Sequence, residues 1–136
     1  MGVLIEGEYI GKKKVRLRHE PSGAEIVTDA PRDNQGEGSA FSPTDLVAGA
    51  LGACMMTIIA IIGERSGLDL AGMRMRVVKE MQDDPRRIAR LPVEIHLPSH
   101  LSPEDRQKLE RAAGTCPVAR SLLPDIHVVP CFLYDV

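Results

Sequence analysis

The sequence predicts an α+β fold: a mostly antiparallel sheet with a long apolar helix, in the element order βββ-α-ββ-α-α-β. Three observations predict it. Short β-prone stretches separated by turn residues fill the amino-terminal part, an uncharged apolar run follows at residues 46–62, and alternating strands and short helices complete the chain. Helices that are segregated from an antiparallel sheet pack on one of its faces. The length of 136 residues suits a single domain, residues 1–136.

The first predicted element is a three-stranded meander. Its strands cover residues 3–11, 14–20 and 24–30, separated by the turn sequences GKKK and PSG. In the second strand Arg16 and Arg18 alternate with apolar residues, which places both arginines on the face opposite the apolar one. That polar face either contacts solvent or lines a pocket.

The long helix has a clear start signal. After a loop rich in proline, glycine and charge, Ser42 suits the N-cap, and Asp45 can reach back to it in a capping box. The helix is expected to run to about Arg65, where Gly67 ends it.

Three further strands follow from alternation of apolar and polar residues. Residues 72–80 and 91–98 alternate in this way, and the turn sequence QDDPRR between them predicts an antiparallel hairpin. Residues 126–136 form a final strand, and Pro130 indicates that it lies at a sheet edge or is interrupted.

Two short helices lie between that hairpin and the last strand. Ser102 suits the N-cap of the first, an amphipathic helix that Gly114 ends. Pro117 can begin a second helix that continues through residue 122, which makes Cys116 its N-cap.

The apolar run at residues 46–62 is long enough to approach a membrane span. Its many Gly and Ala residues, and the lack of Trp or basic clusters at its ends, favour a buried helix instead. A domain of this size has difficulty surrounding a helix that is apolar on all sides, so we expect a homodimer. The small-residue pairs Ala48/Gly52 and Gly49/Ala53 would let a second backbone approach closely.

Composition argues against several partners. The net charge is −2, aromatic residues are 3% and Trp is absent, so nucleic acid is not an expected ligand. The basic run at residues 12–18 is interpreted as a solvated hairpin turn. Glu6 and Glu8 occupy the place where a secretory signal would be cationic, so a cytoplasmic location is expected.

No metal or cofactor is expected. Pro98 lies between His96 and His100 and prevents the helix that would direct both rings at one ion. The segment GEGSAF lacks the third glycine of a dinucleotide fingerprint, and the chain has neither a Gly-Lys-Ser/Thr nor a Cys-x-x-Cys motif.

The three cysteines have different predicted settings. Cys54 lies in the middle of the long helix, where the helix dipole does little, so it needs a nearby cation to become a thiolate. Cys116, as an N-cap, would place its sulfur near the free N–H groups of Val118 and Ala119, which lowers a thiol pKa. From chemistry alone Cys116 is the better nucleophile, and Cys131 is interpreted as a small buried hydrophobe.

Two separated motifs resemble the OsmC/Ohr family, the osmotically inducible and organic hydroperoxide resistance proteins. They are FSPTDLVAGALGACMMT in the long helix and TCPVARSL some sixty residues later. The resemblance covers most of the chain and implies an intertwined homodimer with active sites at the subunit interface. It implies that Cys54 is the peroxidatic cysteine and Cys116 the resolving one, with an organic hydroperoxide as substrate and an external dithiol as reductant.

In that family an arginine holds the thiolate, and a glutamate positions the arginine. The resemblance implies that Arg18, Arg16 or Arg32 serves here, and Arg18 is favoured. The slot of the glutamate holds Thr44, which resembles divergent OsmC-like branches. Two functions therefore stand side by side: a thiol peroxidase, and a non-catalytic dimer that binds a small hydrophobic ligand or senses oxidation.

Overall fold

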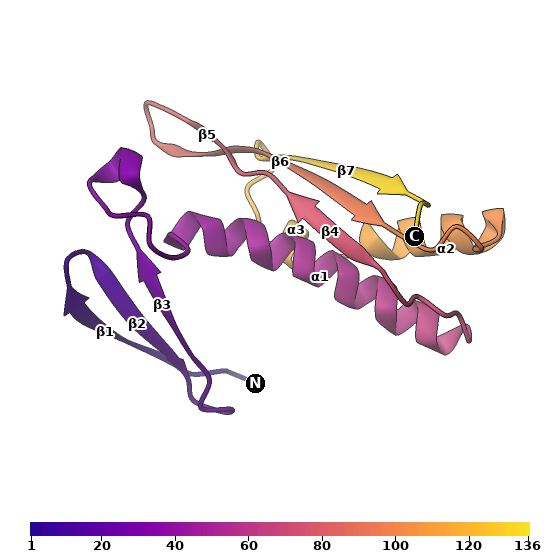
Figure 1. Ribbon diagram of the computed structural model, residues 1–136, viewed down its shortest axis with the longest axis horizontal. Helices are drawn as coiled ribbons and strands as arrows, with labels where there is room; N and C mark the ends of the chain where they lie inside the picture. Colours follow the sequence, from indigo (N-terminus) through magenta and orange to yellow (C-terminus); the bar gives the residue numbers. More distant parts are fainter. The chain divides into compact units, whose positions relative to one another are not determined.

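The computed structural model describes residues 1–136 and divides them into two compact units, Met1–Leu46 and Val47–Val136. Figure 1 shows the elements of each along the chain. The predicted α+β class, with a mostly antiparallel sheet and a long apolar helix, is confirmed. Each unit is described by itself below.

The first unit contains the predicted meander. Strands β1 (Ile5–Gly11), β2 (Lys14–His19) and β3 (Glu25–Asp29) form a three-stranded sheet in that order. Both pairings are antiparallel. Lys12 and Lys13 make the first turn with positive φ angles and exposed side chains, as expected of a solvated hairpin turn. Lys14 of the same basic run differs from that expectation, because its ammonium is buried near Asp29.

The two faces of this sheet differ as predicted. Arg16 and Arg18 lie on the polar face, where Glu6, Glu8 and Glu25 surround them. The opposite face is apolar and contains a hollow of about 160 Å³, lined by Ile5, Leu17, His19, Ala24 and Ile26. No aliphatic side chain of this unit is fully buried, so its apolar face lacks a core.

The loop after β3 leads into helix α1 (Pro43–Arg65) through a short 3₁₀ turn, η1 (Arg32–Asn34). The predicted capping box is present. The Ser42 N–H donates to Asp45 Oδ2 at 2.9 Å, and the Asp45 N–H donates to Ser42 Oγ at 3.1 Å. These two bonds satisfy two donors that a helix start otherwise leaves free.

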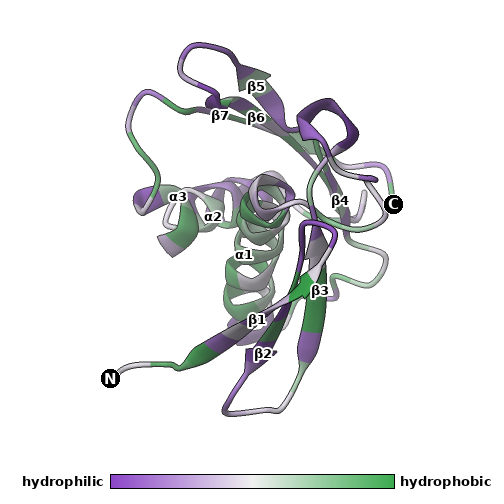
Figure 2. Cartoon of the chain, turned by 90° about the vertical axis from the view of Figure 1, so that its left-hand side faces the viewer, coloured by the Kyte–Doolittle hydropathy of each residue, from purple (hydrophilic) through white to green (hydrophobic).

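One side of α1 is buried and the other is open, although the helix is apolar or neutral over most of its surface (Figure 2). Its buried residues are Ala48, Leu51, Gly52, Met55, Ile59 and Gly63. The opposite stripe, which includes Ala50, Ala53, Thr57 and Ile61, is exposed. By length and composition α1 could also cross a bilayer, a test that core helices pass as well.

The two small-residue pairs of α1 have different surroundings. Gly52 lies under Met75, and a Cβ added there would be 2.7 Å from the Met75 Cε. The Ala48/Gly52 pair therefore allows a strand of the same chain to approach the helix closely. A Cβ added at Gly49 would meet no neighbouring atom within 4 Å, and Ala53 beside it is exposed. Only the Gly49/Ala53 pair is therefore open to a second chain.

The sheet of the second unit is built around β6 (Arg87–His96). On one side β6 pairs antiparallel with β4 (Arg74–Val77) and β5 (Glu80–Gln82), which confirms the predicted hairpin. Strand β5 was not predicted as a separate element: residues 72–80 were interpreted as one strand, although their alternation stops at Val77 and Val78. On the other side β6 pairs in parallel with β7 (His127–Leu133). Strand β7 therefore lies at an edge, as Pro130 indicates.

Helices α2 (Pro103–Ala113) and α3 (Pro117–Arg120) lie with α1 on one face of this sheet, as Figures 1 and 2 show. Ser102 caps α2 by accepting from the Asp105 N–H at 3.1 Å. Helix α3 ends earlier than predicted, and residues 121 and 122 continue it as a turn. The side chains between sheet and helices form the core, which includes Leu51, Ile59, Leu91, Val93, Ile95 and Leu109.

The last residues are fixed to the second unit by side chains. The Tyr134 hydroxyl donates to Glu110 Oε2 at 2.5 Å, and the Arg106 guanidinium lies 4.2 Å from the centre of the Tyr134 ring. His96 Nδ1 contacts both carboxylate oxygens of Asp135, at 2.8 and 2.9 Å. The carboxyl-terminal segment is therefore an ordered part of this unit.

Candidate functional site

Cys54 and Cys116 lie side by side in the core of the second unit. Cys116 belongs to the buried cluster, Cys54 packs against it, and the Cys54 side chain is near enough to Cys116 to raise the pKa of its thiol. Both are free thiols. The structure thus brings together two residues that are far apart in the sequence.

Two neighbouring helices position the Cys116 side chain. Helix α2 ends at residues 113–115, where the Thr115 Oγ donates to the Ala112 carbonyl at 2.7 Å and the Cys116 N–H donates to the Ala113 carbonyl at 3.3 Å. Pro117 then starts α3, and Cys116 is its N-cap as predicted. This tight connection directs the sulfur into the core, where Cys116 has no exposed surface.

The expectation that the N-cap setting lowers the pKa of the Cys116 thiol is wrong. Burial raises the pKa of Cys116 above the usual value of a thiol, and the neighbouring Cys54 thiol raises it further. The N–H groups of Ala119 and Val118 do act in the predicted direction, but they are the weaker influence. The free energy that a thiolate loses when it is removed from water is larger than the stabilisation that two backbone N–H groups give it.

Cys54 is the more accessible member of the pair. It lies on α1 between the buried residues Leu51 and Met55 and is itself only partly buried. A thiol that solvent reaches, next to a thiol that solvent does not reach, can react with an external molecule first and form an internal disulfide afterwards.

Cys131 is separate from this pair, and the expectation that it is buried is wrong. It is exposed on β7 and pairs in register with Glu94 of β6. Because Val93 and Ile95 of β6 point into the core, Glu94 and Cys131 lie on the outer face of the sheet. The register of β7 against β6 therefore determines that the Cys131 side chain lies on the outer face of the sheet.

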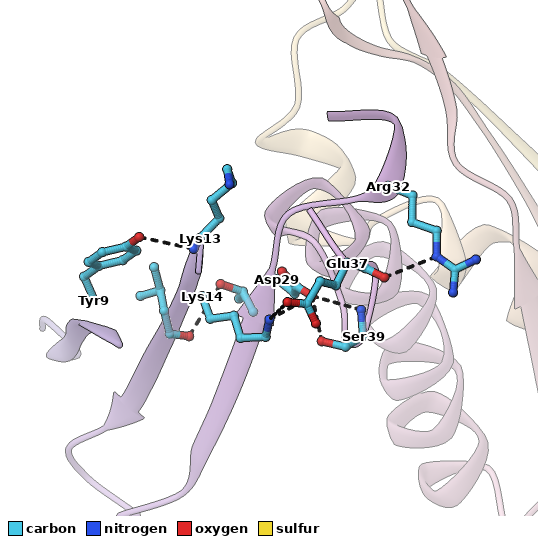
Figure 3. Close-up of polar contacts among 9 residues, drawn as sticks. Tyr9, Lys13, Lys14, Asp29, Arg32, Glu37 and Ser39 are labelled. Atoms are coloured by element: carbon cyan, nitrogen blue, oxygen red, sulfur yellow. Dashed lines mark hydrogen bonds and ion pairs between the residues drawn. The ribbon is translucent and has the colours of Figure 1, made fainter. Parts of the chain in front are cut away.

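Two of the three candidate arginines of the first unit, Arg18 and Arg32, have different partners. The Arg18 Nε donates to Glu20 Oε1 at 3.0 Å, and its Nη1 lies 3.9 Å from Glu25 Oε2. Arg32, in η1, instead donates from Nε to the Glu37 backbone carbonyl at 3.2 Å (Figure 3). Arg18 is therefore paired with carboxylates, whereas Arg32 is held by a neutral group.

A buried cluster of polar and charged side chains, which the sequence analysis did not predict, lies where β2 and β3 meet the loop that carries Arg32. Asp29 is fully buried, and its Oδ2 accepts from the Ser39 N–H at 3.0 Å and from the Ser39 hydroxyl at 2.6 Å. The Lys14 ammonium lies 3.6 Å from the same oxygen and 3.4 Å from Glu37 Oε1. The bonds from Ser39 lower the pKa of Asp29 to about 2, and Lys14 contributes in the same direction.

The signal for this cluster in the sequence is weak. Lys14 and Asp29 face each other across β2 and β3, but the lysine is one of several in a basic run and the aspartate ends a β-prone stretch. Their pairing depends on strand register. No group of three or more His, Cys, Asp or Glu side chains in the chain is arranged to hold a metal ion.

Comparison with known proteins gives a consistent picture. The family of OsmC-like proteins matches residues 36–129 of the chain. A solved protein from Psychrobacter arcticus 273-4, named for an osmotic stress induced and detoxification response, is 40% identical, with a TM-score of 0.92 and 97% of each chain covered. No curated protein sequence matches the chain.

More distant solved structures share the fold. An organic hydroperoxide resistance protein OsmC from Legionella pneumophila is 18% identical, with a TM-score of 0.74 over 98% of this chain and 97% of that chain. An organic hydroperoxide resistance protein from Elizabethkingia anophelis is 12% identical, with a TM-score of 0.78 over 99% of this chain and 97% of that chain. At these identities the likeness concerns the fold alone.

Proposed function

Because the chain belongs to the family of OsmC-like proteins, we propose that it is a thiol-dependent peroxidase that reduces organic hydroperoxides. The observation that carries this proposal is the Cys54–Cys116 pair, with one partly exposed thiol against one fully buried thiol. Such a pair supplies both a nucleophile and a resolving group, and needs no metal. Two more distant relatives of the same fold carry the name organic hydroperoxide resistance protein.

The proposed reaction uses each thiol once. The Cys54 thiolate attacks the terminal oxygen of the hydroperoxide, the O–O bond breaks, and the alkoxide takes a proton and leaves as the alcohol. The resulting Cys54 sulfenic acid condenses with the Cys116 thiol, which forms a disulfide and releases water. An external dithiol, of the lipoyl type or a small molecule, then reduces the disulfide by exchange and is itself oxidised to a disulfide.

The order of the two thiols follows from their settings. The raised pKa of Cys116 makes it a poor first nucleophile, and burial keeps bulky peroxides away from it. Its position beside the sulfenic acid nevertheless favours the second step, because no diffusion is needed and the thiol proton leaves with the sulfenic hydroxyl group as water. Cys54 thus reacts first, with Arg18 or Arg32 as the cation that the resemblance implies for its thiolate.

A homodimer is part of the proposal. The apolar face of the first unit and the open stripe of α1, with Ala53 and Ile61, leave apolar surface exposed in a single chain. A second copy would cover such surfaces, and an intertwined arrangement would do so for both units. We also propose that the protein works in the cytoplasm, where dithiols are kept reduced.

Turnover of cumene hydroperoxide or tert-butyl hydroperoxide with excess dithiol tests the proposal. The native protein should consume peroxide in many turnovers, Cys54→Ser in none, and Cys116→Ser in at most one per chain before it stops. Cys131→Ser is the matched control and should behave as the native protein, since its thiol lies on the outer face of the sheet. Equal slow rates in the native protein and in Cys54→Ser would overturn the proposal.

A second function, in which the same dimer binds a small hydrophobic ligand or senses oxidation, is favoured by one observation. Thr44 occupies the first turn of α1, where the resemblance places a glutamate, and its hydroxyl lies 3.3 Å from the Ser42 hydroxyl. Without a carboxylate there, the arginine would lose its usual support. Retention of an apolar fluorescent probe by Cys54→Ser, without peroxide turnover in the native protein, would favour this function.

A further inference from the structure

We infer that a hollow on the outer face of the second unit's sheet binds a small amino-acid thiol, which forms a mixed disulfide with Cys131 while its ammonium contacts Glu94 and its carboxylate contacts Arg76. The ligand class is a molecule that carries a thiol, an ammonium group and a carboxylate, and cysteine is its smallest member. The inference does not depend on the proposed peroxidase, because the hollow lies on the face of the sheet opposite to the core that contains Cys54 and Cys116.

The hollow lies on the face of the sheet that the helices of this unit leave uncovered. It has a volume of about 250 Å³, and its outward-facing walls are Arg76, Val78, Pro92, Glu94, Val129 and Cys131. The solvated face of a sheet is normally covered by polar side chains. Here Val78 is 55% and Val129 38% exposed, so apolar walls surround a cation, an anion and a thiol. Concave sites with apolar walls and a few polar groups are the usual form of small-molecule sites.

The three polar groups of the hollow lie in one row across the sheet. Arg76 of β4 pairs in register with Glu94 of β6, and Glu94 pairs in register with Cys131 of β7. Figure 1 shows these three strands next to one another. Neighbouring strands are about 4.8 Å apart, so the row spans about 10 Å between its outer Cα atoms. Strand pairing therefore fixes the order guanidinium, carboxylate, thiol.

This order is complementary to the order of groups in an amino-acid thiol. In cysteine the carbon that bears the sulfur is bonded to the carbon that bears both the ammonium and the carboxylate. When the ligand sulfur is bonded to Cys131, the ammonium therefore reaches Glu94 in the middle of the row, and the carboxylate points toward Arg76. A guanidinium can donate two parallel hydrogen bonds to a carboxylate, and an ammonium donates to the Glu94 carboxylate.

The groups of the row are available to a ligand. Arg76 is exposed and has neither a hydrogen bond nor an ion pair, although Glu94 lies directly opposite. Glu94 Oε2 lies 3.9 Å from His96 Nε2, and the other ring nitrogen of His96 contacts Asp135 at 2.8 Å. Cys131 is a free and exposed thiol. A ligand would therefore bind without breaking a contact between Arg76 and Glu94.

The covalent step is a thiol–disulfide exchange in which the symmetrical disulfide of the ligand is the oxidant. The Cys131 thiolate attacks one sulfur of that disulfide, the S–S bond breaks, and the second half leaves as a thiolate that takes up the proton lost by Cys131. The protein thiol is thereby oxidised to the mixed disulfide, and the released half is reduced to the free thiol. An excess of free thiol reverses the step.

The test measures how fast three disulfides of different charge modify Cys131 in the full-length protein. They are cystine, cystamine, which lacks the carboxylates, and 2-hydroxyethyl disulfide, which is uncharged; peptide mass spectrometry reports on Cys131 alone. Arg76→Gln should slow the reaction of cystine by about fivefold, the upper effect of one exposed ion pair, without slowing that of cystamine. Glu94→Gln should slow the reactions of both cystine and cystamine by about as much. Neither variant should change the rate with 2-hydroxyethyl disulfide.

A matched control separates binding in the hollow from a general effect of charge. Arg74→Gln removes the same charge from the same strand face, outside the hollow, and should leave all three rates unchanged. Equal slowing of all three disulfides by Arg76→Gln would indicate a changed thiol without a binding site, and would overturn the inference. Equal slowing of cystine by Arg74→Gln and Arg76→Gln, or no modification of Cys131 by cystine, would also overturn it. Loss of the proposed peroxidase activity would change none of these rates, so the two proposals fail separately.

Discussion

The Cys116 thiol is fully enclosed and lies close to the partly exposed Cys54 thiol, so the two cysteines of the pair differ in access to solvent. A prediction about labelling follows. Iodoacetamide should modify Cys116 last, more than about tenfold slower than the exposed Cys131, because burial suppresses the Cys116 thiolate. Mass spectrometry of timed samples measures the order. In urea the three should react alike, and Cys116 labelling as fast as Cys131 in the folded protein would contradict the prediction.

The loop before α1 should tolerate no side chain at Gly36. A Cβ there would lie 1.8 Å from the Ala30 carbonyl oxygen, so the backbone itself must move. Gly36→Ala is expected to lower the free energy of unfolding by about 2–3 kcal/mol, as overpacking does. Gln35→Gly is the matched control: Gln35 has a φ of 68°, a strained angle for a side chain, so glycine there should leave stability unchanged or raise it by up to about 1 kcal/mol. Urea unfolding of both variants provides the comparison.

Acid should remove the contribution of Asp29 to stability. The folded state lowers the pKa of this carboxyl from 3.8 to about 2, so the ionised form stabilises the fold. The contribution is fully present above the unfolded value and disappears as pH falls through the folded one. The melting temperatures of the native protein and of Asp29→Asn should therefore differ at neutral pH and converge between pH 4 and pH 2. A difference that stays constant down to pH 2 would show that the carboxylate charge has no part in it.

A charge on the open stripe of α1 should dissociate the proposed dimer. Ala53→Glu and Ile61→Glu place a carboxylate on exposed helix surface, so a single chain should still fold. Burying that charge against a second copy would be costly. Sedimentation should give twice the chain mass of 14.8 kDa for the native protein and a single chain mass for either variant. Gln107→Glu, on the exposed side of α2, should leave the mass of the native assembly unchanged.

Loss of one hydroxyl should loosen the carboxyl-terminal segment. Burial and the bond to Glu110 raise the pKa of Tyr134 above its usual value, so the phenol stays protonated and donates across the normal pH range. Tyr134→Phe keeps the ring under Arg106 but leaves Glu110 without this donor, at a cost of about 1–2 kcal/mol. Hydrogen exchange at Leu97 and Val136, whose N–H groups bond across this segment, should accelerate in the variant. Unchanged exchange would contradict a fixing role for Tyr134.

Local signals account for most of the fold. The capping box at Ser42 and the N-cap at Ser102 were readable because a cap is decided by residues within one turn. Strand β5 was not separated from β4, although the alternation of apolar and polar residues stops at Val77 and Val78. Which segment of β6 each of the two strands pairs with depends on tertiary structure and could not be predicted from the local pattern.

The features of the candidate site differ in how far they could be predicted from the sequence, because some of them depend on tertiary contacts. The nearness of Cys54 and Cys116 was implied by a resemblance in two motifs, and no spacing in the sequence would have given it. The direction of the pKa change at Cys116 was missed because the N-cap geometry is local, while desolvation depends on the whole core. The Lys14–Asp29 contact was missed because it depends on the register of β2 and β3.

The close fit of Met75 over Gly52 exposes the fold to chemical damage. The Met75 sulfur would lie 2.8 Å from a Cβ at Gly52, so the thioether fills the groove between sheet and helix completely. Conversion to the sulfoxide adds an oxygen and a strong dipole at this contact. An organic peroxide in excess is therefore expected to disturb the contact between α1 and β4, which makes Met75 a target of oxidation in addition to the cysteines.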